Sequence, residues 1–311
     1  MKKLTALLLG ICTITSIARA QKADSTKAIV HYKFSHLRDT TKINEPYTEN
    51  MVLLLGTKSS VYKSFDLKMQ DAMMKKQVAE QMAAATPGGP IKISIKGGRA
   101  STTEYFMYPA AHKMIRKEKL VNNYLIEEPI PAIKWQISND TASFSGLKCQ
   151  KATTHFAGRD YTAWFCPDLP FRSGPWKLNG LPGLIVEAYD TNKQVEFKFD
   201  GLDDESKIEK TAPGAAEPGT IQSGGSVVKI VGVADDAYNP SVVALPANGI
   251  KTNNKEFNNL KEAMKKDPAA FIQSAMAGSA SNFKPGSINN GKFNVNSGPV
   301  INNPLELPEK K

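Results

Sequence analysis

Residues 149–166 read CQKATTHFAGRDYTAWFC, two runs of strand-forming residues on either side of a glycine. The runs 149–156 and 161–166 are rich in β-branched and aromatic side chains, which favour strands. Between them, Gly158-Arg159 is predicted to form a tight turn. The stretch therefore predicts a β-hairpin.

A second hairpin follows, because residues 184–189 and 194–199 flank the turn-forming residues Asp190-Thr191-Asn192. Near the N-terminus, Val30, Tyr32 and Phe34 alternate onto one face of a strand. Further short strands are expected at residues 51–55, 60–64, 91–96, 105–108, 124–127, 134–138 and 227–233. Such spacing predicts a mainly β (α+β) fold: a curved antiparallel sheet or half-barrel with a helix packed on or in it.

That helix is expected at residues 66–85, before the breaker Thr86-Pro87-Gly88-Gly89-Pro90. It has apolar residues on two sides, which predicts that it lies on or in the concave face of the sheet. Met69, Met73 and Met74 would suit copper in an exported protein, but methionines at helical spacing favour core packing. The sequence predicts no metal site and no cofactor.

The N-terminus has the pattern of an export signal. Lys2 and Lys3 precede an apolar stretch, and Ala18-Arg19-Ala20 supplies an A-x-A cleavage site. We expect residues 1–20 to be a signal peptide, and the mature chain to lie in the periplasm or at the cell surface. No later segment is long and apolar enough to be a transmembrane helix.

Residues 21–276 are expected to form a single domain, within which the acidic and then Pro/Gly-rich residues 203–226 form a loop or linker. Asn253 and Glu256 have the spacing of a helix capping box. Residues 277–311 are low in complexity and are predicted to be a disordered tail, with only Leu305-Glu306-Leu307 apolar enough to differ.

Charge gives little support for nucleic-acid binding. Removing the signal lowers the formal net charge from +10 to +7, and the basic residues are spread along the chain. The densest basic cluster, residues 112–119, is interrupted by apolar and acidic residues and is predicted to be a solvated face. Export would also keep the chain away from most nucleic acids.

The three tryptophans, Trp135, Trp164 and Trp176, lie within one part of the chain. Pro182-Gly183 suits the centre of a type II turn, in which the glycine takes a positive φ. If a cleft exists, the sequence predicts that its lining includes Trp164, Phe165, Trp176 and Leu181. The alternative is a sheet corner packed by large side chains.

These residues also carry a family resemblance, since Gly180–Ile185 reads GLPGLI. The chain resembles the GLPGLI family of exported proteins, known chiefly from the Bacteroidota. Further matching motifs are Cys149-x-Lys151-Ala152-Thr153, Gly158-Arg159, Ala163-Trp164-Phe165, Gly174-Pro175-Trp176-Lys177 and Asn303-Pro304-Leu305-Glu306-Leu307. The resemblance implies export and a largely β fold, and it implies no established reaction. Cys166 stands where similar sequences more often have Thr or Ser.

The motifs of common catalytic sites are absent from the sequence: G-x-S-x-G, H-E-x-x-H, a phosphate loop and a helix-opening G-x-G-x-x-G. His155 could act as a base with Asp160 or Asp168, but a single histidine in a strand favours a structural role. We expect no catalytic residues.

The expected function is that of an exported non-catalytic binding or carrier protein acting near the outer membrane. Its partner would be a hydrophobic ligand or an outer-membrane protein. One alternative is a secreted or periplasmic hydrolase, and another is an accessory subunit of a surface or transport complex.

Cys149 and Cys166 are the only cysteines after residue 20, and an oxidising compartment would allow a disulfide between them. A turn at Gly158-Arg159 would make them diagonal neighbours, with Cβ atoms about 7 Å apart, which is too far for a bridge. A shifted register or a bulge would set them opposite. A bridge closing about 17 residues would stabilise the fold by about 3 kcal/mol, and the alternative is two buried thiols.

Overall fold

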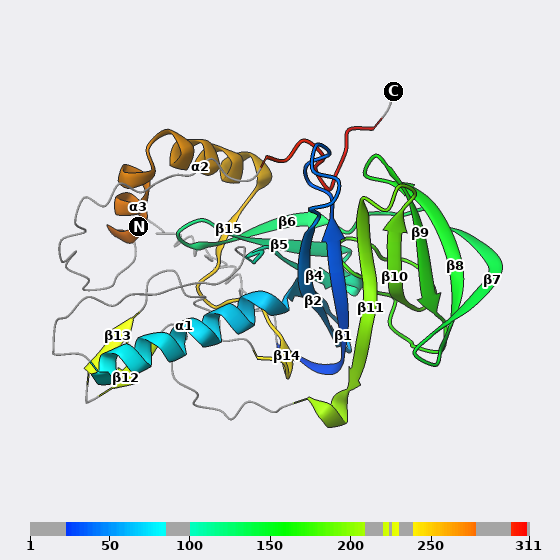
Figure 1. Cartoon of the computed structure of the whole chain (residues 1–311), viewed down its shortest axis with the longest axis horizontal. Coiled ribbons are helices and arrows are strands. Elements are labelled where there is room, and N and C mark those ends of the chain that lie inside the picture. The colour runs from blue at the N-terminus through cyan, green and yellow to red at the C-terminus, as the bar shows by residue number, and fades with distance from the viewer. Residues whose placement is uncertain are drawn as a thin grey trace, which may run out of the picture.

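A computed structural model describes residues 23–84, 100–208, 220–223, 226–229, 239–277 and 300–309. The fold is mainly β, as the sequence predicts, and its centre is one open sheet of 13 strands (Figure 1). The strands of this sheet are β1 (Asp24–His36), β2 (Tyr47–Gly56), β3 (Ser60–Ser64), β4 (Glu104–Tyr108), β5 (Lys113–Lys119), β6 (Asn123–Pro129), β7 (Gln136–Phe144), β8 (Leu147–Phe156), β9 (Arg159–Cys166), β10 (Leu184–Asp190), β11 (Val195–Asp204), β14 (Val242–Val243) and β15 (Ile250–Thr252).

The sheet consists of two meanders that meet at β1, in the order β15-β6-β5-β4-β3-β2-β1-β11-β10-β9-β8-β7, while β14 pairs with β1. Neighbouring strands are antiparallel throughout, except that the short β15 runs parallel to β6. The antiparallel prediction is therefore confirmed for both predicted hairpins.

Alternation along β1 divides the apolar residues between two faces of the sheet. Val30, Tyr32 and Phe34 enter one large cluster, the main core, whereas Ile29 enters a second cluster on the other side. The segment between β9 and β10 packs on the main core through Trp176, Leu178 and Leu181, with exposures of 0–1%.

The long helix α1 (Phe65–Ala84) lies elsewhere than predicted. Phe65 packs beside the second cluster, and the helix then extends away from β1 and β2 (Figure 1). Met69 and Met73 are 46% and 50% exposed, so the prediction that they fill a core is wrong. The physical reason is that lysines and glutamines interrupt its apolar residues all around the helix, which leaves no continuous stripe to bury.

Two helices follow β15, namely α2 (Asn254–Lys266) and α3 (Pro268–Ala277). The predicted capping interaction is present, since the Asn253 side chain accepts a hydrogen bond of 2.9 Å from the Glu256 backbone N–H. Phe257 anchors α2 by packing against Tyr124 and Ile126 of β6. None of the helices in the described residues has both the length and the apolarity needed to span a membrane.

The β8–β9 turn differs from the prediction by one residue. Phe156 pairs with Arg159, so the turn residues are Ala157 and Gly158, with φ of 51° and 73°. Two positive φ values are typical of the type I′ hairpin, whose twist matches that of the strands. In the register that results, Gln150 pairs with Phe165 at the end of the ladder, and continuing this register by one residue sets Cys149 opposite Cys166.

The GLPGLI turn also differs from the prediction. Gly180, not Gly183, has a positive φ, of 92°. Gly183 N–H donates to the Leu181 carbonyl at 2.9 Å, which closes a tight turn around Pro182. Gly183 is needed for space, because a Cβ there would overlap the carbonyl oxygen of Cys166.

Part of the predicted linker and part of the predicted tail are structured. Strand β11 continues to Asp204, η2 (Glu205–Lys207) follows, and β12 (Thr220–Ser223) pairs with β13 (Ser226–Lys229). Residues 300–309 pack against the body, so the predicted disordered tail contains a docked stretch. The predicted signal peptide and the strand at 91–96 lie outside the described residues.

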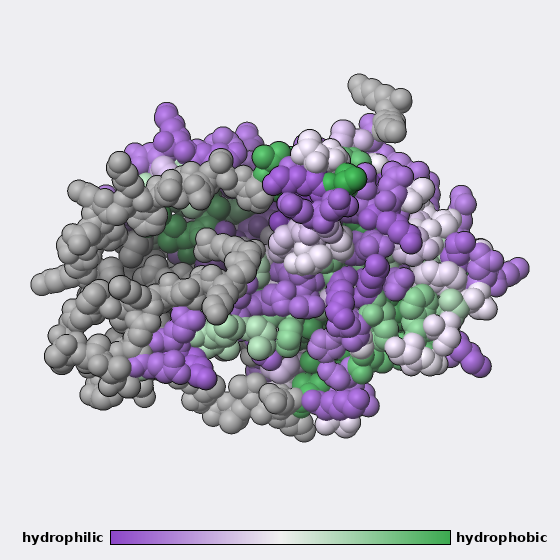
Figure 2. All heavy atoms as spheres, viewed as in Figure 1, coloured by the Kyte–Doolittle hydropathy of each residue, from purple (hydrophilic) through white to green (hydrophobic). Residues whose placement is uncertain are grey.

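Hydrophilic residues cover most of the described surface on the face shown in Figure 2, with smaller apolar areas between them. Most of the large aromatic residues are buried, so the search for a functional site starts with the core.

Candidate functional site

The four residues predicted to line a cleft do not form an open wall. Phe165, Trp176 and Leu181 are 0–1% exposed in the main core, while Trp164 is half-buried beside Phe144. Alternation along β9 explains the difference, because Phe165 points inward and Trp164 outward. Of the two alternatives left open by the sequence, the packed sheet corner describes their burial better.

The interior of this corner nevertheless contains unsatisfied polar atoms. Among the described residues, the Tyr62 and Tyr161 hydroxyls are buried without a hydrogen-bond partner. The buried Trp176 indole nitrogen makes no well-formed hydrogen bond, although it interacts with the Tyr105 side chain. They belong to one aromatic group, since the Trp176 ring lies 6.4 Å from Tyr161 and 6.4 Å from Phe197, and Tyr62 lies 6.3 Å from Phe197. Buried polar groups in proteins almost always bind a protein atom, a water or a ligand.

Tyr32, in the same core, shows the usual arrangement. Its hydroxyl donates to the Ile185 carbonyl at 2.6 Å. Burial raises the pKa of Tyr32 and of Tyr62 well above the ordinary tyrosine value, so both are neutral hydroxyls at neutral pH. The difference between them is the missing partner of Tyr62.

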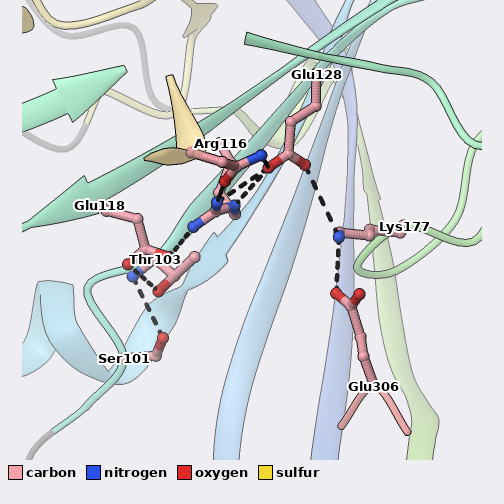
Figure 3. A network of polar contacts seen from close by, with 8 residues as sticks. Ser101, Thr103, Arg116, Glu118, Glu128, Lys177 and Glu306 are labelled. Atoms are coloured by element: carbon pink, nitrogen blue, oxygen red, sulfur yellow. Dashed lines mark hydrogen bonds and ion pairs between the residues drawn. The ribbon is translucent and has the colours of Figure 1, made fainter. Parts of the chain in front are cut away.

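A row of charged and polar side chains extends from Arg116 to Lys177 and Glu306 (Figure 3). Arg116 of β5 contacts Glu118 at 2.6 Å and Glu128 of β6 at 2.9 Å. Lys177 lies 3.8 Å from Glu128 and 2.7 Å from Glu306. We call these five residues the polar belt.

The belt corrects the prediction that residues 112–119 form a solvated face. Arg116 has only 16% of its side chain exposed, and Lys117 on the other face has 5% and contacts Glu104 at 2.9 Å. The two partner carboxylates raise the pKa of Arg116 despite its burial. A run of mixed charges gave no sign of this pairing, because it appears only when β5 and β6 pair and bring Glu128 beside Arg116.

A second polar centre surrounds Arg159. Its guanidinium donates to Asp190 at 2.7 Å, and these two side chains are only 3% and 4% exposed. It also donates to the Asn303 side chain at 2.7 Å and to the carbonyls of Pro304 and Leu305 at 2.7 and 3.0 Å. Arg159 thus joins the β8–β9 hairpin to the C-terminal residues.

His36 contributes to the same centre from the end of β1. Its Nε2 lies 2.9 Å from the Asn303 carbonyl oxygen, an arrangement that requires Nε2–H to donate. Burial is the main cause that lowers the pKa of His36 to about 4. The Asn303 bond opposes this shift, and the positive charges of Arg38 and Arg159 add to it. His36 is therefore neutral at neutral pH.

Acidification from pH 6.5 to pH 4 should destabilise the protein through His36. In this window the unfolded chain takes up a proton at an ordinary pKa of 6.5, whereas the folded histidine stays neutral until about pH 4. The free energy of unfolding therefore decreases as the pH is lowered, and His36 accounts for at most about 3 kcal/mol of the decrease. Urea unfolding of wild type and His36→Gln at several pH values measures it, since glutamine keeps an N–H donor without titrating.

His155→Gln is the matched control. Asp160 and Glu309 raise the pKa of His155, so its contribution is present at low pH and is lost as the pH rises above its ordinary range. That variant should keep the acid destabilisation. An equal acid slope in wild type and His36→Gln would contradict the assignment.

The geometry of His155 does not suit a general base. Nδ1 lies 2.6 Å from Asp160 and Nε2 lies 2.9 Å from Glu309, so carboxylates occupy both nitrogens of this exposed ring. The raised pKa favours the doubly protonated ring, which has no free lone pair to accept a proton. Asp160, and not Asp168, is its neighbour.

Cys149 and Cys166 are both buried and both free thiols in the structure. Burial and the neighbouring Cys166 raise the pKa of Cys149 to about 12. The two thiols are therefore neighbours in the main core, on adjacent strands, without a bond between them.

Comparison with known proteins gives limited matches. Residues 157–187 match the model of a family described as "Protein of unknown function (Porph_ging)", and this stretch includes the GLPGLI segment. No curated protein matches the chain. Two crystal structures of PNGF-II, in space groups C2 and P21, are similar to 76% of this chain at 8% and 10% identity, each with a TM-score of 0.45. The chain spans about a third of the length of those structures, 32% and 33%.

Proposed function

We propose that this chain is an exported, non-catalytic binding protein that acts near the outer membrane and holds a small amphipathic ligand in its aromatic corner. One observation carries the proposal: two buried hydroxyls, on Tyr62 and Tyr161, lack partners within a single aromatic group, and the Trp176 indole beside them makes no well-formed hydrogen bond. The apolar body of such a ligand would contact the aromatic rings, and its acceptor atoms would bind these donors.

The free-energy argument favours an occupant. Leaving one buried donor without a partner costs about 1–3 kcal/mol, so two such hydroxyls together are unfavourable unless a ligand or ordered water binds them. The belt carboxylates Glu118 and Glu128 both contact Arg116, which favours binding over their use as a catalytic acid and base.

Tyr62→Phe should separate binding from folding. Because the Tyr62 hydroxyl has no protein partner, its removal should leave the free energy of unfolding unchanged or raise it by up to about 1 kcal/mol. Ligand retention should fall at least fivefold. The measurement is native mass spectrometry of protein purified after incubation with a lipid extract, combined with urea unfolding.

Tyr32→Phe is the matched control, since its hydroxyl bonds to the Ile185 carbonyl. It should destabilise the fold by about 1 kcal/mol while the ligand remains. If no small molecule above a control protein is recovered, or if Tyr62→Phe retains it fully, the proposed function is wrong and water fills the corner.

The same proposal of export predicts a disulfide. The register sets Cys149 opposite Cys166, where Cβ atoms are about 5 Å apart and a small adjustment permits a bond. A disulfide oxidant of the compartment would accept two electrons as both thiols lose their protons. Intact mass of the exported protein, alkylated without reductant, should show no added alkyl group, and two after reduction. Two alkyl groups added before reduction would contradict the disulfide. The Cys149→Ser variant should gain one alkyl group with or without reduction.

A further inference from the structure

The C-terminal residues 302–307, which we call the tail segment, are bound as an extended peptide would be. Asn302 and Asn303 N–H donate to the Arg38 carbonyl at 3.1 and 3.0 Å, and Leu307 N–H donates to the Ala157 carbonyl at 2.9 Å. The segment therefore adds backbone hydrogen bonds at both of its ends, at the end of β1 and at the β8–β9 turn.

Side chains of the body recognise the backbone between these ends. Arg159 binds the carbonyls of Pro304 and Leu305, and His36 binds the carbonyl of Asn303. Contacts of this kind accept a peptide in one register, because each donor meets one carbonyl.

Asn303 gives the segment its specificity. It is 6% exposed, its Oδ1 accepts from Arg159 at 2.7 Å, and its Nδ2 donates to the Leu37 carbonyl at 2.7 Å. Both ends of the amide are used, so aspartate or leucine could not replace it.

Three further residues of the segment fit the body. Leu305 packs on the main core, and Glu306 contacts Lys177 of the polar belt. Leu307 lies so close to Gly158 that a Cβ at Gly158 would overlap it. We call the residues of the body that contact the tail segment the groove, and its contacts fit the pattern Asn-Pro-Leu-acid-Leu.

The chain between the helices and the tail segment is long enough to reach a second molecule. Residues 278–299 separate α3 from the docked stretch, and 22 residues span up to about 75 Å when extended.

We propose that this groove is a peptide-binding site that accepts the tail segment of a second copy of the chain, so that two copies can exchange their C-termini. This is independent of the ligand in the aromatic corner. A groove that binds its own segment noncovalently makes the same contacts whether the segment comes in cis or in trans. The in-trans complex then depends on protein concentration.

The test uses the full chain with a protease site inserted within residues 278–299. After cleavage, a fluorescent peptide of residues 300–309 should replace the original segment in the folded protein, and its anisotropy should rise to saturation. The Asn303→Asp peptide should bind at least tenfold more weakly. A Glu309→Gln peptide should bind within threefold of the original, because the contacts of Glu309 within the described part of the chain are the exposed His155 ring and the Gly158 N–H.

Uncleaved protein supplies the second measurement. Refolding at high concentration should give a dimer by light scattering, and an excess of free peptide should suppress it. Equal binding of the Asn303→Asp peptide, or failure of the peptide to enter the folded cleaved protein, would overturn the peptide site. A monomer at every concentration would overturn the exchange between copies.

Discussion

Arg159→Met should lower the free energy of unfolding by about 3–5 kcal/mol, because it leaves the Asp190 carboxylate buried without its counterion. Methionine fills much of the same volume but donates no hydrogen bond. The carbonyls of Pro304 and Leu305 would also lose their partner, so the tail segment should detach. Urea unfolding gives the first effect, and protease sensitivity after residue 300 gives the second.

Lys33→Met is the matched control. Lys33 contacts Asp200 at 2.6 Å, almost the same distance as the 2.7 Å between Arg159 and Asp190, but the two side chains are 64% and 40% exposed. An exposed ion pair contributes about 0–1 kcal/mol, so this variant should be nearly as stable as wild type. Equal effects of the two variants would show that burial does not set the strength of the Arg159 pair.

Gly183→Ala should destabilise the protein by about 3 kcal/mol or more, although it adds a single methyl group. The new Cβ would overlap the Cys166 carbonyl oxygen and crowd the Pro167 backbone, and neither can move without shifting β9. Thermal and urea unfolding would measure the loss.

Gly146→Ala provides the comparison. Gly146 has φ of 88°, and no atom lies within 4 Å of the position that a Cβ would take there. Alanine at this site should therefore cost only about 1 kcal/mol, the free energy of placing a residue with a Cβ at a positive φ. If Gly183→Ala were no worse than Gly146→Ala, close packing would not be the reason for glycine in the GLPGLI turn.

Local patterns predicted most of the sheet correctly. Two examples are the alternation of Val30, Tyr32 and Phe34 and the capping interaction at Asn253. Both depend on residues close in sequence, so they could be predicted without knowledge of the tertiary structure. The predicted position of the β8–β9 turn was wrong by one residue. Arg159 belongs to the strand, where it binds Asp190 and the tail segment. Those partners are 31 or more positions away and leave no local signal.

The candidate site shows the same division. Clustered aromatic residues indicated the corner where Phe165 and Trp176 lie, but alternation alone could not reveal that the β9–β10 segment folds onto the main core and buries Trp176 there. The polar belt was missed, because Arg116 reads as one of several scattered basic residues until Glu128 is brought beside it, and Lys177 until Glu306 is brought beside it (Figure 3).

The sequence by itself determined that this protein is mainly β and antiparallel, since hydrophobic periodicity and turn residues act over a few positions. The tertiary structure alone decided the strand register, the placement of α1 outside the main core and the docking of residues 302–307. Each of these depends on contacts between distant segments. Their free energy comes from burial and from pairing of charges such as Arg159 and Asp190, and neither exists until the chain is folded.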